Sequence, residues 1–248
     1  MSTQNTQNST LQGQKALVTG ATSGIGKAVA LRLGLDGAEV IVHGRDAERG
    51  SEVIDAITAA GGSARFEAAD LSDADDVRRL AKVVGDVDVL VNNGGFSAWG
   101  PTGDFDIDKF DAMFATNVRA PFLLVGAFAP GMAARGKGSI INLSSMAGLI
   151  GLAGGAAYGA TKASLASMTR AWAAEYSPSG VRVNAIAPGP VYTEGSQDDL
   201  ITGLGATTLV DRAANPEEIA EVIGFLASPR ASYVTGAVVA ADGGRTAI

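Results

Sequence analysis

The sequence contains no cysteine and only one histidine, His43, among its 248 residues. Without cysteine the chain cannot form disulfides, thiolate zinc sites or a thiol nucleophile. A single histidine cannot build a histidine-rich metal centre. We therefore expect no metal cofactor, and we look for chemistry carried by hydroxyl, phenol, amine and amide groups.

Basic residues are also few, with 19 lysines and arginines against 26 acidic residues and a net charge of -7. A protein that binds nucleic acid normally carries a basic face, so this class of function is disfavoured. An acidic balance does not exclude a small phosphorylated ligand, because such a ligand needs only a local set of N–H donors.

Long hydrophobic runs are missing as well. The longest apolar run lies between Arg119 and Arg135, is shorter than the roughly 20 residues of a membrane span, and contains two prolines. Residues 1–10 are polar and predict a disordered tail rather than a secretory signal. We therefore expect no membrane segment and a cytoplasmic location.

The composition is 46% hydrophobic and 18% charged, which is sufficient for a large buried core. Short apolar runs predict strands at 15–20, 38–44, 64–70, 87–93, 138–145, 181–189 and 236–244. The runs are continuous rather than alternating, and helical segments separate most of them. This pattern is typical of parallel strands buried on both faces. It predicts an α/β fold with a doubly wound parallel sheet of the Rossmann type, in one domain over residues 11–248.

The helical segments are predicted at 25–37, 46–60, 72–84, 106–134, 156–176 and 216–228. Ser72 is expected as an N-cap, with Asp75 three residues later in the manner of a capping box. Pro121 is expected to bend the long segment 106–134. Residues 191–210 show no strong period; the family resemblance described below implies that they form a mobile lid over the substrate.

A glycine-rich loop, TGATSGIG, joins the first predicted strand to the first predicted helix and contains Gly20, Gly24 and Gly26. The spacing is G-x-x-x-G-x-G, one residue longer than the usual dinucleotide fingerprint. Alone such a loop is weak evidence, because it can be a simple turn. At the start of a βαβ unit it indicates a site where helix N–H groups bind a pyrophosphate.

Tyr158 and Lys162 lie one helical turn apart among small residues. They are either the rim of an amphipathic helix or a device for proton transfer. Free tyrosine has a pKa of about 10, and lowering it by about three units requires about 4 kcal/mol of preferential phenolate stabilisation. A nearby ammonium group can supply this, which would bring the phenol toward the working pH of an acid/base catalyst.

Together, TGATSGIG, the NNGG segment at 92–95 and the set Ser145, Tyr158 and Lys162 resemble the short-chain dehydrogenase/reductase superfamily. The resemblance covers Lys15 to the end and favours the short, single-domain branch. It implies an NAD(P)-dependent oxidoreductase that transfers a hydride between nicotinamide and a carbonyl or secondary alcohol.

The resemblance also implies catalytic roles. Tyr158 is expected to be the acid/base, and Lys162 to bind the ribose hydroxyls and tune the phenol. Ser145 is expected to orient the substrate carbonyl; Ser144 is its rival by position, but the spacing of thirteen residues to Tyr158 favours Ser145. Asn117 is expected to hold a water in a proton relay, with a simple helix bend as the alternative.

The cofactor contacts implied by the resemblance are Gly20, Thr22, Ser23, Gly24, Ile25, Gly26, Arg45, Asp70, Leu71, Asn92, Gly94, Tyr158, Lys162, Pro188, Gly189, Val191 and Thr193. Arg45 follows the second strand, where a positive charge accommodates the 2′-phosphate of NADP, so we favour NADP(H) over NAD(H). The alternative is a solvated loop charge that pairs with Asp46. Asp70 is expected at the adenine ring or as a helix cap, and Gly94, which replaces the usual alanine, is expected to loosen its turn.

The expected substrate contacts are Gly95, Phe96, Trp99, Ser145 and Tyr192, although Trp99 could instead only anchor its loop. Relatives of this length commonly form homotetramers through their long middle helices, and we expect the same here. One alternative function is a 3-oxoacyl-[acyl-carrier-protein] reductase, in which Arg135 and Lys137 would help to dock an acidic carrier. Ala174, where such relatives often have arginine, argues against it. The other alternative, a non-catalytic dinucleotide-binding protein, would be expected to lose Ser145, Tyr158 or Lys162.

Overall fold

The computed structural model describes residues 10–194 and 196–248, and this part of the chain forms a parallel sheet flanked by helices. The strands are β1 (Lys15–Val18), β2 (Glu39–Gly44), β3 (Ser63–Ala68), β4 (Val89–Asn92), β5 (Gly138–Leu143), β6 (Val181–Pro188) and β7 (Val238–Ala241). The helices are α1 (Gly24–Leu35), α2 (Ala47–Ala59), α3 (Ala74–Val84), α4 (Ile107–Phe114), α5 (Ala120–Ala134), α6 (Ala156–Tyr176), α7 (Asp198–Gly205) and α8 (Pro216–Ala227).

The strand order in the sheet is β3-β2-β1-β4-β5-β6-β7, and every pair is parallel. The order reverses direction between β1 and β4. At such a switch point the connections leave β1 and β4 toward opposite faces, which opens a crevice outside the carboxyl ends of these strands. The predicted doubly wound α/β fold is confirmed, and the crevice locates the candidate site.

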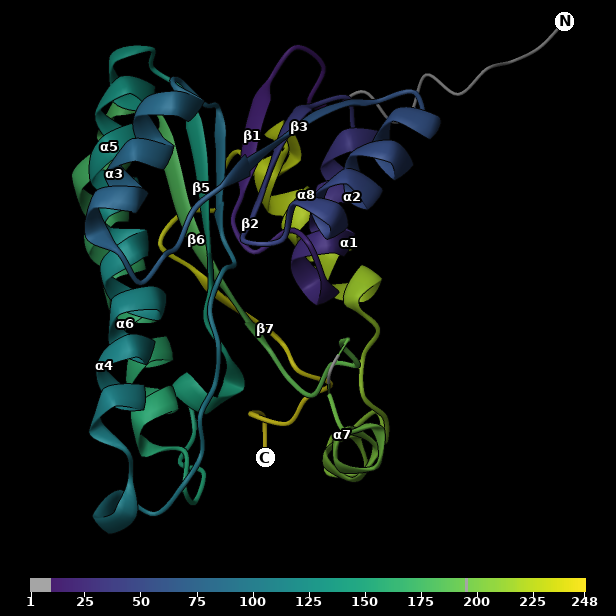
Figure 1. Cartoon of the computed structure of the whole chain (residues 1–248), viewed down its shortest axis with the longest axis vertical. Helices are drawn as coiled ribbons and strands as arrows, with labels where there is room; N and C mark the ends of the chain where they lie inside the picture. Colours follow the sequence, from purple (N-terminus) through teal and green to yellow (C-terminus); the bar gives the residue numbers. More distant parts are fainter. Residues whose placement is uncertain (1–9, 195) are drawn as a thin grey trace, which may run out of the picture.

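Two helical layers cover the sheet, with α1, α2 and α8 on one face and α3, α4, α5 and α6 on the other (Figure 1). Successive residues of a strand point to opposite faces, so β1 contributes to both layers. Val18 packs in one core with Val29 of α1 and Ile223 of α8, while Leu17 packs in the other core with Leu124 of α5. Because both faces are covered, the strands read as continuous apolar runs in the sequence.

Aspartates set the beginnings of three helices. The carboxylates of Asp46, Asp73 and Asp106 each accept from two backbone N–H groups in the first turn of α2, α3 and α4. The predicted cap of the third helix is therefore wrong by one residue. Ser72 instead donates its hydroxyl and its backbone N–H to Asp70, 2.8 Å away in both cases.

The segment predicted as one helix over 106–134 is divided by a π-helical turn at Ala115–Arg119. Pro121 has no N–H, so it cannot make the α-helical bond to the carbonyl of Asn117 four residues earlier. The irregularity expected at Pro121 thus takes the form of a π-helical turn just before it, and the bend itself stays a prediction. By length and composition alone Ile107–Ala134 could cross a membrane, but α5 packs its Leu124 and Met132 into the core beside the sheet.

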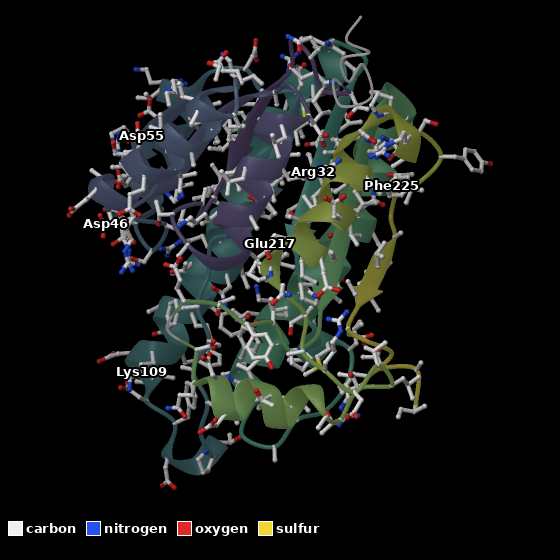
Figure 2. All side chains as sticks on the ribbon, turned by 90° about the vertical axis from the view of Figure 1, so that its right-hand side faces the viewer. Arg32, Asp46, Asp55, Lys109, Glu217 and Phe225 are labelled. Carbon is white, nitrogen blue, oxygen red and sulfur yellow. The ribbon has the colours of Figure 1, made fainter. Side chains whose placement is uncertain are left out.

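Helices α1 and α8 lie side by side and are joined by a polar cluster at Arg32 (Figure 2). Arg32 donates to both carboxylate oxygens of Asp36 at 3.0 Å and forms an ion pair with Glu221 of α8. Asp36 is buried, so this pairing satisfies a charge that would otherwise be costly. The contact fixes α1, whose N-terminus carries the glycine-rich loop.

The segment 191–210, predicted to lack regular structure, contains α7. This helix stands away from the sheet at the end where β6 finishes (Figure 1). Val191 forms an isolated bridge with Ala214 and is buried in the core, so the segment is anchored at its beginning. The prediction of a mobile lid stays a prediction.

Candidate active site

A cleft of about 790 Å³ lies at the carboxyl ends of the strands, over the switch point. Thirteen of the predicted cofactor contacts line it: Gly20, Thr22, Ser23, Gly24, Ile25, Gly26, Arg45, Asp70, Leu71, Gly94, Tyr158, Lys162 and Thr193. Asn92, Pro188, Gly189 and Val191 do not line it. Sequence reasoning missed Ser97, Ala112, Thr116 and Glu194, which carry no motif and reach the cleft only through the fold.

The glycine loop lines the cleft, and its backbone adopts a conformation that only glycine accommodates well. Gly20 and Gly24 adopt φ angles of 62° and 50°, in the left-handed region that favours glycine. At Gly26 an added Cβ would lie 2.1 Å from the carbonyl oxygen of Gly20, so helix and loop pack too closely for any side chain. Unlike α2, α3 and α4, α1 has no side-chain cap on its first turn. Its N–H groups are therefore available to an anionic ligand, which fits a dinucleotide pyrophosphate.

His43 ties this loop to the sheet. Its Nδ1 accepts from the backbone N–H of Gly20 at 3.1 Å, and its Nε2 lies 3.2 Å from the carbonyl oxygen of Ala69. These bonds define the neutral tautomer with the proton on Nε2. Burial lowers the pKa of His43 to about 4, against smaller raising effects of the Ala69 carbonyl, Asp76 and Asp70. The histidine is therefore a structural support under the loop rather than a ribose contact.

Asn93 supports the same loop from β4. Its Nδ2 donates to the carbonyl oxygens of Thr19 and Gly20 at 2.8 and 3.1 Å. The preceding Asn92 is buried and donates to Asn142 on β5 at 2.8 Å, so it braces the sheet below the cleft as the resemblance implied. The doubled asparagine of NNGG is the sequence signal that could have identified Asn93.

The Leu71 side chain packs directly against the Cα of Gly94. An added Cβ at Gly94 would lie 2.5 Å from Cδ1 of Leu71. The Leu71 side chain takes up the space, and the Thr19 hydroxyl accepts from the Gly94 N–H at 2.9 Å, while the expected loosening of the turn stays a prediction.

At the end of β2, Gly44 and Arg45 face the cleft. A Cβ at Gly44 would lie 2.4 Å from the methyl carbon of Thr22. Arg45 is exposed and forms no ion pair within the described residues; Asp46, its suggested partner, caps α2 and pairs with Arg49 at 3.4 Å. Asp70 lines the cleft but is also engaged by Ser72, and these hydrogen bonds lower the pKa of its carboxyl group. Asp70 therefore does not cap α3, which Asp73 does, and its contact with an adenine ring stays a prediction.

Tyr158 and Lys162 project from α6, whose bounds match the prediction, and both line the cleft. The Lys162 Nζ lies 5.7 Å from the centroid of the Tyr158 ring and donates to the carbonyl oxygen of Leu143 at 2.7 Å. Ser145 follows β5, its hydroxyl accepts from the Ala147 N–H at 3.1 Å, and its side chain acts to lower the pKa of the Tyr158 phenol. Its rival Ser144 is buried and donates to the carbonyl oxygen of Lys162, so Ser145 is the serine available to a ligand.

The electrostatics of this pair follow from burial. Burial lowers the pKa of the Lys162 ammonium group to about 8. Burial raises the pKa of the Tyr158 phenol, and the hydrogen bond with Ser145 opposes this rise. Lys162 by itself therefore does not lower the pKa of the phenol here, where its Nζ donates to the Leu143 carbonyl, and the predicted lowering stays a prediction for the protein with its cofactor bound.

Asn117 lies in the π-helical turn and clamps the loop that follows β4. Its Oδ1 accepts from the Phe96 N–H at 3.1 Å, and its Nδ2 donates to the Phe96 carbonyl at 2.9 Å and to the Thr161 hydroxyl at 3.2 Å. Thr161 in turn donates to the Tyr158 carbonyl at 2.7 Å. The side chain therefore links the loop to the catalytic helix, while the Asn117 carbonyl is freed from Pro121.

The predicted substrate contacts divide between two places. Gly95 and Phe96 line the cleft, and the ring of Trp99 lies 5.7 Å from that of Tyr158. Tyr192 lies in an adjoining hollow and bonds the Thr202 hydroxyl of α7 at 3.0 Å. Thr193 and Glu194 reach the cleft, and Glu194 pairs with Lys27 of α1 at 3.6 Å.

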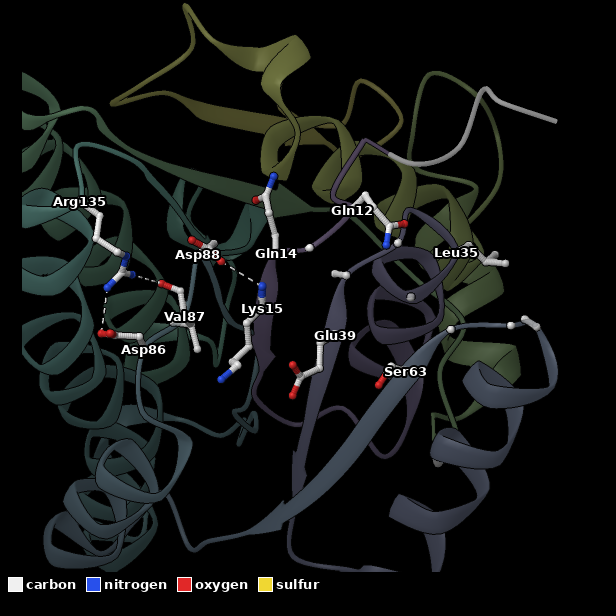
Figure 3. A pocket seen from close by; sticks show the side chains of 17 residues that line it. Gln12, Gln14, Lys15, Leu35, Glu39, Ser63, Asp86, Val87, Asp88 and Arg135 are labelled. Carbon is white, nitrogen blue, oxygen red and sulfur yellow. Dashed lines mark hydrogen bonds and ion pairs between the residues drawn. The ribbon is translucent and has the colours of Figure 1, made fainter.

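A second cavity of about 740 Å³ lies at the opposite, amino-terminal edge of the sheet, where Lys15, Glu39 and Ser63 begin their strands (Figure 3). Arg135 lines it and bonds Asp86 at 2.9 Å and the Val87 carbonyl at 2.7 Å. Lys137 pairs with Asp88 nearby at 3.5 Å. The two cations suggested for carrier docking are thus on the far edge from the cleft, and that suggestion is wrong.

Known proteins resemble this chain over nearly its full length. A family model described as enoyl-(acyl carrier protein) reductase matches residues 20–246. The chain belongs to the short-chain dehydrogenase/reductase superfamily. Accordingly, its activity is NAD(P)-dependent transfer of a hydride between nicotinamide and a carbonyl or secondary alcohol.

Three relatives illustrate the range of the superfamily. The cis-4-hydroxycyclohexanecarboxylate dehydrogenase of Sinomonas cyclohexanicum is 39% identical over 94% of this chain and 96% of its own. A 3-oxoacyl-[acyl-carrier-protein] reductase of Thermotoga maritima is 35% identical over 94% of this chain and 98% of its own. The crystal structure of a blue fluorescent protein from a metagenomic library, in complex with NADPH, is 36% identical, with a TM-score of 0.90 over 96% of this chain and 98% of its own.

Proposed function

We propose that the protein is an NADP(H)-preferring reductase of ketones or aldehydes, with Tyr158 as its acid/base. The observation that carries the proposal is that Tyr158 and Lys162 both line the cleft at the switch point, with the Lys162 Nζ 5.7 Å from the centroid of the phenol ring. The bound dinucleotide supplies or accepts the hydride. The first turn of α1 holds its pyrophosphate, and Arg45 with Thr22 faces its adenosine ribose.

The proton is handled by the residues of α6 and β5. In the reducing direction the Tyr158 phenol donates its proton to the substrate oxygen as the carbonyl carbon is reduced. Ser145 donates a hydrogen bond to the same oxygen and orients it. Lys162, released from the Leu143 carbonyl, binds the ribose hydroxyls and stabilises the phenolate that remains. Asn117 holds a water through which the phenolate regains its proton.

The preference for NADP(H) rests on the end of β2. A carboxylate there would favour the 2′-OH of NAD, but Gly44 has no side chain and its Cβ position is occupied by Thr22. Arg45 has no described anionic partner and can bond a 2′-phosphate with two parallel N–H groups. The NADPH complex of the metagenomic relative supports the same choice.

The test is oxidation of NADPH and NADH, followed at 340 nm in parallel, against ketones, aldehydes, β-keto esters and thioesters. We expect turnover of at least one carbonyl compound, faster with NADPH. Absence of turnover with every compound, in a protein shown to bind the cofactor, would overturn the proposed reductase function. It would favour a non-catalytic dinucleotide-binding protein.

Reduction of acyl-carrier-protein thioesters is the second candidate, since the matched family model and the Thermotoga maritima relative carry that description. Against it, Arg135 and Lys137 lie at the amino-terminal edge of the sheet and are paired with Asp86 and Asp88. Comparing a free carbonyl compound with a carrier-bound thioester in the same assay separates the two.

A homotetramer in the cytoplasm completes the proposal. Phe122 of α5 is 57% exposed, and its ring lies 6.2 Å from that of Trp172 on α6. Trp172 itself is buried, so the exposed aromatic surface on these two helices is that of Phe122, and its burial against another subunit would support the tetramer. Light scattering measures the mass directly, and a monomer would contradict the tetramer.

A further inference from the structure

Two large aromatic side chains remain exposed beside the catalytic residues. Phe96 is 41% and Trp99 is 50% exposed, and both belong to the loop between β4 and α4. Isolated exposed apolar residues are common and need no explanation. Two aromatic residues three positions apart at the edge of a catalytic cleft are a more specific arrangement, provided that the loop holds them in place.

The loop does hold them. Asn117 bonds both the N–H and the carbonyl of Phe96, which fixes the backbone at that residue. The Gly100 N–H donates to the Gly154 carbonyl at 2.9 Å, which fixes the other side of Trp99. Between these anchors the indole packs over Gly155, where an added Cβ would come within 2.6 Å of the ring.

The position of the indole relates it directly to the reaction. The ring centroids of Trp99 and Tyr158 are 5.7 Å apart, with an angle of 46° between the planes. A substrate whose oxygen meets the phenol therefore extends past the indole. Trp99 is half exposed, and its exposed surface is available to a substrate that extends past the Tyr158 ring.

The charged residues that line the cleft also bear on which substrates can bind beside Trp99. Among the described residues that line it, the cations are Arg45 and Lys162, and the carboxylates are Asp70 and Glu194. Arg45 lies at the end of β2, away from the phenol, and Lys162 is 5% exposed and bonded to Leu143. Of the residues that line the cleft, the cation on the same helix as the phenol is the buried Lys162, so a substrate carboxylate or phosphate near Trp99 has no exposed cationic partner among them.

We propose that the substrate is an uncharged alicyclic or aryl ketone whose ring lies against Trp99, and that anionic keto acids are disfavoured. This inference rests on the proposed reductase function. Trp99 acts here as a specificity residue, and the proton transfer itself belongs to Tyr158. The earlier alternative, that Trp99 only anchors its loop, predicts no discrimination between charged and uncharged rings.

The experiment compares 4-methylcyclohexanone with 4-oxocyclohexanecarboxylate, which share the ring and the carbonyl and differ in a methyl or carboxylate group. Initial rates with saturating NADPH give kcat/KM for each. We expect the methyl compound to be preferred by about 100-fold, as for a site that leaves a polar group unpaired. An equal or higher kcat/KM for the carboxylate would overturn the inference and leave the reductase function intact.

Trp99→Ala tests the assigned surface. We expect a rise of about tenfold in KM for 4-methylcyclohexanone with unchanged NADPH affinity, and partial recovery in Trp99→Phe. Phe225→Ala, which removes an aromatic residue that is 39% exposed on α8, is the matched control and should change neither value. An unchanged KM in Trp99→Ala, or a panel in which only anionic compounds are reduced, also overturns the inference. Absence of turnover with every compound overturns the reductase function itself.

Discussion

The side chain of Thr22 occupies the space beside Gly44 that any larger residue would need, with its methyl carbon 2.4 Å from the Cβ position. The two residues belong to different elements, the glycine loop and the end of β2. A carboxylate side chain at position 44 would select NAD. Thr22 leaves no space for such a side chain unless Thr22 itself moves.

The relationship predicts the outcome of a cofactor switch. Gly44→Asp alone should weaken both cofactors, because Thr22 must move and the loop moves with it. In Gly44→Asp with Thr22→Ala, only the Cβ of residue 22 remains, 3.3 Å from the new atom. We expect the double variant to bind NADH about tenfold more tightly than the single variant, by fluorescence titration. Equal NADH affinity in the two would show that Thr22 is no obstacle, and Thr22→Ala alone is the control.

Arg45→Ala tests the recognition of the 2′-phosphate. Loss of charge-assisted hydrogen bonds should weaken NADPH by about 10- to 100-fold and leave NADH nearly unchanged. Dissociation constants for the two cofactors, measured on the same preparation, give the ratio. Parallel losses would mean that Arg45 does not contact the phosphate. Arg49→Ala, one turn into α2, serves as a control for the general loss of positive charge.

Tyr158→Phe removes the proton donor and retains the ring that packs beside Trp99. We expect kcat to fall by about 100- to 10,000-fold with intact NADPH binding, which is the usual size of a general acid/base contribution. Stopped assays with high enzyme concentration can follow the residual rate. A variant within tenfold of the wild-type rate would remove Tyr158 from the acid/base role.

The lowered pKa of His43 predicts that the folded protein loses stability in acid. Its pKa of about 4 in the folded protein lies below the ordinary value of 6.5, so the unfolded chain binds the proton more readily. The stability that the neutral ring provides is complete above pH 6.5 and is lost as the pH falls toward 4. At pH 5 the loss amounts to about 2 kcal/mol.

The measurement is urea unfolding of the wild type and His43→Gln at pH 7 and pH 5. Glutamine has an amide that can accept and donate, but it does not titrate. The difference in unfolding free energy between the two proteins should shift by about 2 kcal/mol in favour of the variant at pH 5. An identical acid response would assign the effect to other groups, of which Asp76, Asp70 and Arg45 also act on this ring.

Much of the fold could be predicted from the sequence because its signals are local. Continuous apolar runs gave the strands, and the bounds of α6 agree with the prediction. The cap of α3 was misplaced because Ser72 and Asp73 are both good N-cap residues, and only the fold shows that Ser72 turns back to Asp70. Helix α7 was missed because it is only eight residues long and buries only Gly205, so no run of core residues marks it in the sequence.

The residues of the candidate site likewise fall into those whose proximity the sequence predicts and those that only the fold brings together. Tyr158 and Lys162 are neighbours on one helix, so their proximity follows from spacing alone. The pairs Asn117 with Phe96, Trp99 with Tyr158 and Thr22 with Gly44 join different elements, and no local pattern specifies them. The direction of the Tyr158 pKa shift was also beyond the sequence, because it depends on burial and on the partner that Lys162 selects.

The π-helical turn at Ala115–Arg119 has a consequence for the engineering of this enzyme. A π turn holds one residue more than the α-helical turn it replaces, so deleting a residue there would let α4 and α5 join as one regular helix. Such a deletion would replace the π-helical turn with a regular α-helical turn. It would also rotate Asn117 away from Phe96 and close the gap at its carbonyl. Optimising this helix for stability therefore acts against turnover, and any thermostable redesign should keep the length of this segment fixed.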